Sequence, residues 1–132
     1  MKIKRIWDED GVSVPHPFCR EVRMVFGPDR EEVKDCNLIC ALIPPGSSTD
    51  QRDRDRTELL YIVEGKGEFF CNGETYPLTS DSCVYVEAGD VIQIRNNGKE
   101  TLKLISVYLE PFRAEDLYRR LLESARNEAS IS

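Results

Sequence analysis

The middle of the chain is a series of short apolar segments, each closed by glycine, proline or asparagine. This pattern constrains the fold more than any other feature of the sequence. The clearest stop is Asn72-Gly73, which favours a two-residue hairpin because both central residues of such a turn take positive φ. Short strands closed in this way are typical of an antiparallel sandwich or barrel. The expected strands are residues 37–43, 59–63, 68–71, 74–78, 83–86, 91–95 and 101–109.

The two ends of the chain differ from this middle part. Residues 114–129 are predicted to form a helix, because Leu117, Leu121 and Leu122 recur at helical spacing. Residues 2–7 and 21–26 are candidate strands. We therefore expect one domain over residues 1–132, with an N-terminal arm at 1–35, a barrel at 36–112, and a helix with a short tail at 113–132.

Composition excludes several classes of protein. A chain of 132 residues is long enough for a hydrophobic core, and 18 basic against 24 acidic residues give a net charge of −6. An acidic chain without a basic cluster is a poor nucleic-acid binder. No apolar run approaches the roughly 20 residues that a membrane helix needs. The first residues also lack the apolar stretch of a signal peptide, so the expectation is a cytoplasmic protein without a membrane partner.

The cysteines do not indicate a metal centre or a disulfide framework. Their number, five, is odd, they contain no Cys-x-x-Cys pair, and His16 is the only histidine. Without an export signal the thiols are expected to be reduced. A zinc site is therefore not predicted, and no cofactor is assigned.

Over about residues 38–112 the chain resembles the small single-domain cupins, which carry two sequence motifs. The residues in register with the first motif are Gly46, Glu58 and Gly65, and those in register with the second are Gly89 and Asn96. Glu87 stands where the second motif has a proline. The resemblance implies an all-β fold, an antiparallel cupin-type β-barrel (a double-stranded β-helix or jelly roll) with a C-terminal α-helix. It also supports a homodimer.

The chain departs from this family at the metal-binding positions. In the family, two histidines and a glutamate of the first motif and one histidine of the second bind a divalent metal; the matching positions here are Arg52, Arg54, Glu58 and Ile92. A protonated arginine cannot donate to a metal, and isoleucine has no donor atom. A single carboxylate does not hold a transition metal tightly. We therefore predict that no metal occupies this site.

A shifted set of carboxylates is the alternative way to hold a metal. Asp50, Asp53 and Asp55 lie nearby, and Asp53 and Asp55 share a strand face if the segment is extended. Oxygen ligands alone favour hard ions such as calcium or magnesium. This alternative would make the protein a metal-dependent cupin enzyme of isomerase or dioxygenase type, but it breaks the spacing between Gly46 and Glu58.

The arginines indicate a different ligand. If Glu58 points inward, Arg52 and Arg54 are expected on the same side of the segment. Glu58 can neutralise one of the two guanidinium groups, and a ligand carboxylate or phosphate would pair with the other. The interpretation is a pocket for a small anionic or sugar-like molecule. The candidate ligand-binding residues are Arg52, Arg54, Glu58, Tyr61, Tyr85 and Arg95. No catalytic residue is assigned, and the sequence leaves open whether the protein is an enzyme.

A plain structural interpretation competes with this one. A run of alternating charge such as residues 50–56 is often a solvated surface whose arginines pair with neighbouring acids. The protein would then be a structural or regulatory cupin that acts through its dimer surface. Inward-facing Arg52, Arg54 and Glu58 beside an open cavity would favour the pocket, and a barrel plugged by Ile92, Ile94 and Leu104 would favour the structural role.

Overall fold

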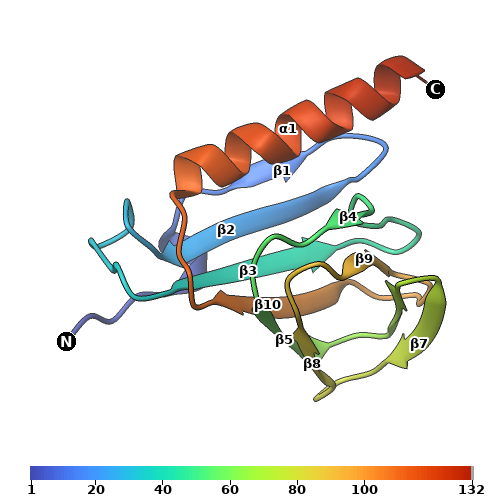
Figure 1. Ribbon diagram of the computed structural model, residues 1–132, viewed down its shortest axis with the longest axis horizontal. Coiled ribbons are helices and arrows are strands. Elements are labelled where there is room, and N and C mark those ends of the chain that lie inside the picture. The colour runs from blue at the N-terminus through green and yellow to red at the C-terminus, as the bar shows by residue number, and fades with distance from the viewer. Residues whose placement is uncertain (132) are drawn as a thin grey trace.

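The chain folds into two antiparallel sheets that face each other, with one long helix at the C-terminus, as the computed structural model shows for residues 1–131 (Figure 1). The six-stranded sheet has the order β1-β2-β3-β10-β5-β8, and the four-stranded sheet has the order β4-β9-β6-β7. The strands are β1 (Val12–Val14), β2 (Arg20–Phe26), β3 (Asn37–Ile43), β4 (Arg52–Asp53), β5 (Glu58–Glu64), β6 (Gly67–Cys71), β7 (Glu74–Leu78), β8 (Cys83–Val86), β9 (Val91–Arg95) and β10 (Leu102–Tyr108). This is the antiparallel fold with a C-terminal helix that the sequence predicts.

Turn chemistry sets where the strands end. Asn72 and Gly73 both have positive φ, 50° and 87°, and they join β6 to β7 as a tight hairpin. Gly65, between β5 and β6, has a φ of 100°, and an added Cβ there would lie 2.8 Å from the carbonyl oxygen of Thr101. A larger residue would therefore be strained by its backbone conformation and would also collide with the next segment.

Alternation along each strand separates an inner from an outer face. On β10, Leu102, Leu104, Ser106 and Tyr108 are buried while the residues between them are only half-buried. The neighbouring strands β3 and β5 pair with β10 in antiparallel register. The fully buried side chains at the centre of the barrel are mainly aliphatic: Ile43, Ile62, Val86, Ile92 and Leu102.

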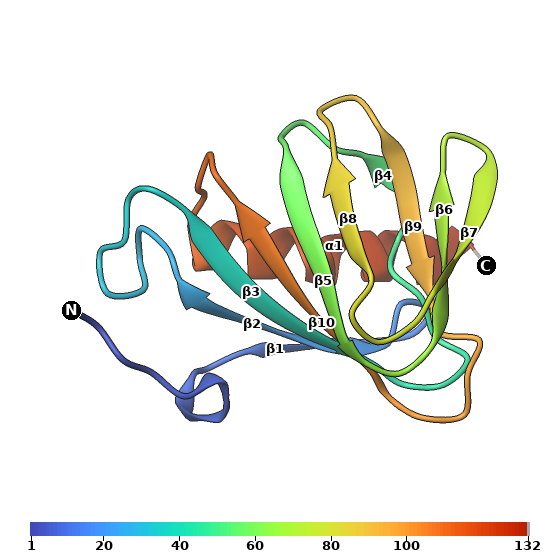
Figure 2. The same cartoon turned by 90° about the horizontal axis from the view of Figure 1, so that it is seen from below.

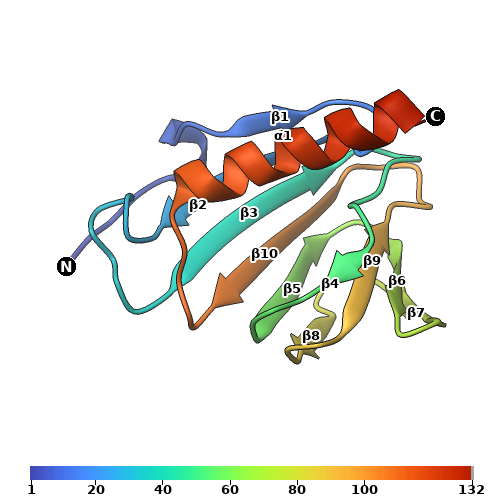
Figure 3. The same cartoon turned by 45° about the horizontal axis from the view of Figure 1, so that its top comes forward.

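Helix α1 (Ala114–Ile131) covers one side of the barrel. It passes along β1 and β2 and extends toward the end that carries β4 and β9 (Figures 2 and 3). Its buried residues in the core are Ala114, Leu117, Leu121 and Ala125. The hydroxyl of Tyr118 accepts a hydrogen bond of 2.7 Å from the backbone N–H of Met24 in β2. Over the described residues, no helix combines the length and apolar composition that a bilayer crossing requires.

The candidate strand at residues 2–7 is wrong. That segment contains a 3-10 turn at Ile6–Asp8, and the first strand is β1. Ile3 and Trp7 are largely exposed, so the segment has no buried face of the kind that a strand against the core requires. The Trp7 ring instead contacts the charged ends of Arg23 and Lys103, at 5.3 and 5.1 Å from the ring centre. The second candidate strand, 21–26, is confirmed as β2.

Candidate functional site

The first residue of β5 brings a carboxylate into the barrel. Glu58, Leu60 and Ile62 are buried along this strand, while Leu59 and Tyr61 between them are exposed. Glu58 is only 3% exposed, and its Oε2 accepts a hydrogen bond of 2.8 Å from the hydroxyl of Ser106. Its Oε1 lies 3.4 Å from Nε of Arg54. The carboxylate is therefore held by a strand neighbour on one side and a guanidinium on the other.

Burial and the charge of Glu58 together raise the pKa of Tyr108 well above its usual range. Tyr108 is paired directly across the ladder with Glu58. Its hydroxyl is therefore protonated at neutral pH. It contributes a polar but neutral group to the interior.

A second acid–base pair joins β2 to the loop that precedes β4. The Nη2 of Arg20, the first residue of β2, lies 3.5 Å from Oδ1 of Asp50, and the other oxygen of Asp50 accepts a hydrogen bond of 3.0 Å from Ser124 in α1. Burial lowers the pKa of Arg20 to about 10; Asp50 opposes this shift and the positive charges of nearby arginines add to it. A guanidinium at this pKa is still charged at neutral pH.

Backbone hydrogen bonds position the segment between these two pairs. The N–H of Thr49 donates to the carbonyl oxygen of Ile94 at 2.9 Å, and the Thr49 hydroxyl accepts from the Ile94 N–H at 2.9 Å. Further along, the N–H of Arg54 donates to the carbonyl oxygen of Asp90 at 2.9 Å. The two-residue strand β4 pairs Arg52 with Ile92 of β9. Arg52 therefore shares a sheet face with a residue that is fully buried.

These side chains line one cavity of about 70 Å³ that is partly open to solvent. Helix α1 lines one side of it with Leu117, Arg120 and Leu121. Apolar residues including Ile94 and Leu104 line the rest of it. The charged lining residues are Arg20, Asp50, Arg52, Arg54, Glu58 and Arg120. The interior is thus partly filled by aliphatic side chains, as the structural interpretation requires, yet it keeps a small cavity whose charged lining has two more cations than anions.

Three of the six candidate ligand-binding residues line this cavity, and three do not. Arg52, Arg54 and Glu58 line it. Tyr61 and Tyr85 lie on the outer face of the six-stranded sheet, and the hydroxyl of Tyr61 donates to Asp81 there. Arg95 is exposed at the end of β9, with its guanidinium 5.1 Å from the ring centre of Phe70. Strand alternation is the reason: each of these three is an odd number of positions from an inward-facing residue of its own strand.

Several lining residues were not among the sequence candidates. Ser106 and Tyr108 follow Leu104 at every second position, so the inward face of β10 could have been extended to them. Arg120 lies between Leu117 and Leu121 on the apolar stripe of the C-terminal helix. A charge on such a stripe is a signal available in the sequence. Nothing local marks Arg20, because its place depends on how β2 packs.

The residues at the metal-binding positions of the resemblance do not fit a metal. Arg52, Arg54 and Ile92 supply no donor, and Glu58 is already engaged by Ser106 and Arg54. The alternative set of carboxylates, Asp50, Asp53 and Asp55, is not brought together by the described structure. Asp50 lies in the cavity with Arg20, whereas Asp55 is exposed beside Arg56. The side chain of Asp53 is outside what the structure describes. Among the described residues no group of three His, Cys, Asp or Glu could hold a metal ion.

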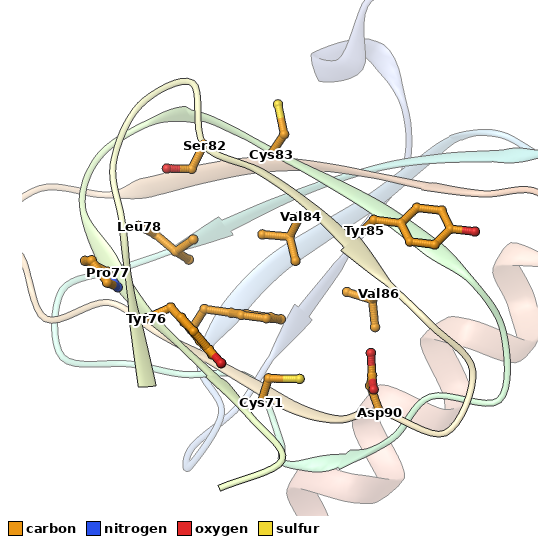
Figure 4. Close-up of a pocket in the computed structure, with 11 residues that line it drawn as sticks. Cys71, Tyr76, Pro77, Leu78, Ser82, Cys83, Val84, Tyr85, Val86 and Asp90 are labelled. Atoms are coloured by element: carbon orange, nitrogen blue, oxygen red, sulfur yellow. The ribbon is translucent and has the colours of Figure 1, made fainter. Parts of the chain in front are cut away.

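A second hollow, of about 480 Å³, lies between β7 and β8 (Figure 4). Leu78, Val84 and Val86 point into it, whereas Cys83 and Tyr85 point away. Its acidic residue, Asp90, accepts hydrogen bonds from Asn72 and from the backbone N–H of Glu87. Asp90 therefore holds the turn before β9, and this hollow offers an apolar surface rather than a charged site.

The chain is similar to curated proteins over part of its length. The chain is 29% identical over 68 residues to an oxalate-binding protein of Thermotoga maritima, a match that covers 51% of this chain and 56% of that protein. It is 31% identical over 75 residues to the alginate biosynthesis protein AlgA of Pseudomonas putida, covering 56% of this chain and 16% of that protein. The matched part therefore spans about half, or much less, of the length of these curated relatives.

Solved structures with the same fold match a larger share of this chain than the curated relatives do. A predicted oxalate decarboxylase of Thermotoga maritima superposes with a TM-score of 0.71 at 21% identity, covering 83% of this chain and 99% of that chain. Ectoine synthase from P. lautus superposes with a TM-score of 0.74 at 18% identity, covering 91% of this chain and 86% of that chain. At these identities the likeness shows the fold alone.

The family itself follows from the sequence match. Residues 39–108 match the family model described as the cupin domain, which is more than half of the chain. That range contains most of β3 and all of the strands from β4 to β10. It also contains the cavity-lining residues Arg52, Arg54 and Glu58. The chain therefore belongs to the cupin domain family.

Proposed function

We propose that the barrel binds a small anion, with a carboxylate as the favoured class, and that guanidinium groups rather than a metal hold it. The observation that carries this proposal is the excess of positive charge around the cavity, where the described side chains include four arginines and two carboxylates. Burying unpaired guanidinium groups is costly unless an anion compensates them. Arginine also presents a planar set of donors that matches a carboxylate.

The size of the cavity limits the ligand. A buried water takes about 10–15 Å³ of such volume, so about 70 Å³ corresponds to roughly five waters. A compact carboxylate of a few heavy atoms fits this space better than a sugar. The name of the oxalate-binding relative from Thermotoga maritima supports the same class of ligand. Sugar acids and phosphosugars belong in the screen because the sequence also allows a sugar-like ligand.

The test is a binding screen on the full chain after dialysis against a chelator. Melting temperature and calorimetry would be measured with oxalate, malonate, acetate, gluconate and a hexose phosphate. We expect a carboxylate to bind without added metal, and Arg52→Ala or Arg54→Ala to weaken it about tenfold. Glu58→Gln should weaken binding less, because it removes a negative charge from the cavity.

Arg95→Ala is the matched control, since this arginine lies outside the cavity and should leave binding unchanged. The proposal fails if no member of the screen shifts the melting temperature. It also fails if binding disappears in chelator and returns with a divalent metal, the result that the metal-dependent alternative requires.

A homodimer is a second proposal, supported by the outer face of the six-stranded sheet. Leu59, Tyr61 and Tyr85 are exposed there by 43%, 41% and 62%. Cross-strand register makes the patch continuous, because Leu59 pairs with both Val107 and Tyr85, and Tyr61 pairs with Ile105 and Cys83. A contiguous apolar surface of this kind is typical of an interface. A cytoplasmic location stays a prediction from the sequence.

A further inference from the structure

Arg120 enters the binding cavity from outside the barrel. It lies on α1, on the same face as Leu117 and Leu121, and lines the cavity with them. One turn further along α1, Ser124 donates its hydroxyl to Asp50 and so anchors the helix to the cavity wall. The helix is therefore part of the proposed binding site, and Arg120 is its charged contribution.

The half-buried side chain of Arg120 lacks an ion-pair partner among the residues that the structure describes. Its Nε is buried without a hydrogen-bond partner among the residues that the structure describes, and no described acid lies within ion-pair distance of its side chain. Its guanidinium is 5.9 Å from the ring centre of Phe112, a contact that offsets only part of the desolvation. Burial, and next the charge of Arg52, lower the pKa of Arg120.

Among the side chains that the structure describes, ion pairing in the cavity leaves two guanidinium groups without an acid. Asp50 pairs with Arg20 at 3.5 Å, and Glu58 pairs with Arg54 at 3.4 Å. Arg52 on β4 and Arg120 on α1 remain, and the charge of Arg52 raises the cost of charging Arg120. Glu128, an exposed acid of α1, shares a surface hollow with Arg52, but solvent screens such a charge from the interior.

From this pairing we infer that Arg120 makes the site select a compact dicarboxylate over a monocarboxylate of the same shape. The inference rests on the proposed function. A ligand with two carboxylates gives one to each of these two guanidinium groups, whereas a monoanion leaves one of them in the cavity without an anion. The site then discriminates between the two ligands because the complex with the monocarboxylate contains one guanidinium without an anion.

Oxalate and oxamate test this directly, because oxamate replaces one carboxylate of oxalate by an uncharged amide of nearly the same size. We expect the wild-type chain to bind oxalate at least about tenfold more tightly than oxamate. Arg120→Gln should weaken oxalate about tenfold and oxamate by less than about twofold, so that the preference is lost. Arg120→Lys keeps the charge and should keep part of the preference.

Arg119→Gln is the matched control. Arg119 is adjacent on α1 but exposed, with an ion pair to Asp116 at 2.9 Å, and its loss should change neither affinity. Without ligand, Arg120→Gln should melt at the wild-type temperature or higher, because it removes a half-buried charge that has no ion-pair partner among the described residues. A purely structural role for Arg120 would instead lower the melting temperature.

The outcomes separate this inference from the proposed function. If the wild-type chain binds both ligands equally and Arg54→Ala weakens both, the anion site stands and the dianion selectivity is wrong. Selectivity by Arg120 is also wrong if Arg120→Gln weakens both ligands by the same factor, or if Arg119→Gln has the same effect. If no carboxylate binds the wild-type chain, the proposed function itself fails.

Discussion

At the scale of single residues, the two asparagines buried in the sheets act as structural residues. Asn37 donates to the carbonyl oxygen of Phe112 and accepts from its N–H, both at 3.0 Å, which ties the segment before α1 to β3. Asn96 is fully buried after β9. Its amide donates to the carbonyl oxygens of Ile43 and Glu100, each at 2.8 Å, and its Oδ1 accepts from the N–H of Gly98 at 2.9 Å. The asparagine of the second cupin motif therefore closes a loop and does not contact the cavity.

This role predicts a specific loss of stability. Asn96→Ala should lower the free energy of unfolding by about 3 kcal/mol, because it leaves two carbonyl oxygens and one N–H without their partner in a buried place. Urea denaturation measures the change, and Asn97→Ala, at the exposed neighbour, should stay within about 0.5 kcal/mol of wild type. Equal stability of the two variants would contradict the assignment.

Glu58 shows how one residue can match a family motif while its surroundings change its chemistry. In this chain its carboxylate contacts a hydroxyl and a guanidinium. Glu58 keeps the register of the motif, but Arg52, Arg54 and Ile92 supply no metal donor and the two arginines add positive charge. This charge is the basis of the proposed anion site.

At the scale of elements, the start of α1 is fixed by a residue from a distant loop. Both carboxylate oxygens of Asp29 accept backbone hydrogen bonds, from the N–H of Ala114 at 2.7 Å and from that of Glu115 at 3.1 Å. These are the N–H groups that a helix leaves unpaired at its N-terminus. Although partial burial opposes the shift, these bonds lower the pKa of Asp29.

Removing this cap should destabilise the chain in a pH-dependent way. Asp29→Ala is expected to cost about 1–2 kcal/mol near pH 7. Because the folded pKa is lowered, the contribution of Asp29 is fully present above its ordinary pKa of 3.8 and is lost as the pH falls through the folded value. The difference between wild type and variant should therefore shrink below about pH 4.

Chemical denaturation at several pH values measures this difference. Asp35→Ala removes an exposed acid in the same stretch of chain and should change the free energy of unfolding little at any of them. A cost of Asp29→Ala that stays constant down to pH 3 would show that the carboxylate charge is not what caps α1.

At the scale of the whole molecule, one sheet face carries the polar interior and the other carries the exposed apolar patch. β5 contributes to both, since its alternate residues point in opposite directions. The proposed dimer would cover Leu59, Tyr61 and Tyr85 without touching the arginines of the cavity. Binding and assembly should therefore be separable by mutation.

The double variant Leu59→Lys, Tyr85→Lys tests the proposed interface. Light scattering after size exclusion should give a dimer mass for wild type and a monomer mass for this variant, because two charges would be buried against apolar side chains. Tyr76→Lys is the control, since Tyr76 is 47% exposed on β7 of the other sheet. A wild-type monomer at high concentration would refute the dimer.

What the sequence by itself determined is local. The strands 37–43, 74–78, 83–86 and 91–95 were predicted with the boundaries that the structure has, because alternation and turn residues act over a few positions. The register of Gly46, Glu58, Gly65, Gly89 and Asn96 likewise carried the cupin fold. It brought Arg52, Arg54 and Glu58 to the cavity because they belong to one continuous motif.

The rest depended on tertiary structure. Residues 2–7 have strand-like composition, yet the sheet pairs β2 with β1 instead. Arg20 and Arg120 reach the cavity only because β2 and α1 pack against the same end of the barrel. Their meeting is a long-range contact between segments at opposite ends of the chain, and no spacing along the chain encodes such a contact. The sequence thus determined the barrel and half of its charged lining, whereas packing of the chain ends decided the charge balance of the cavity.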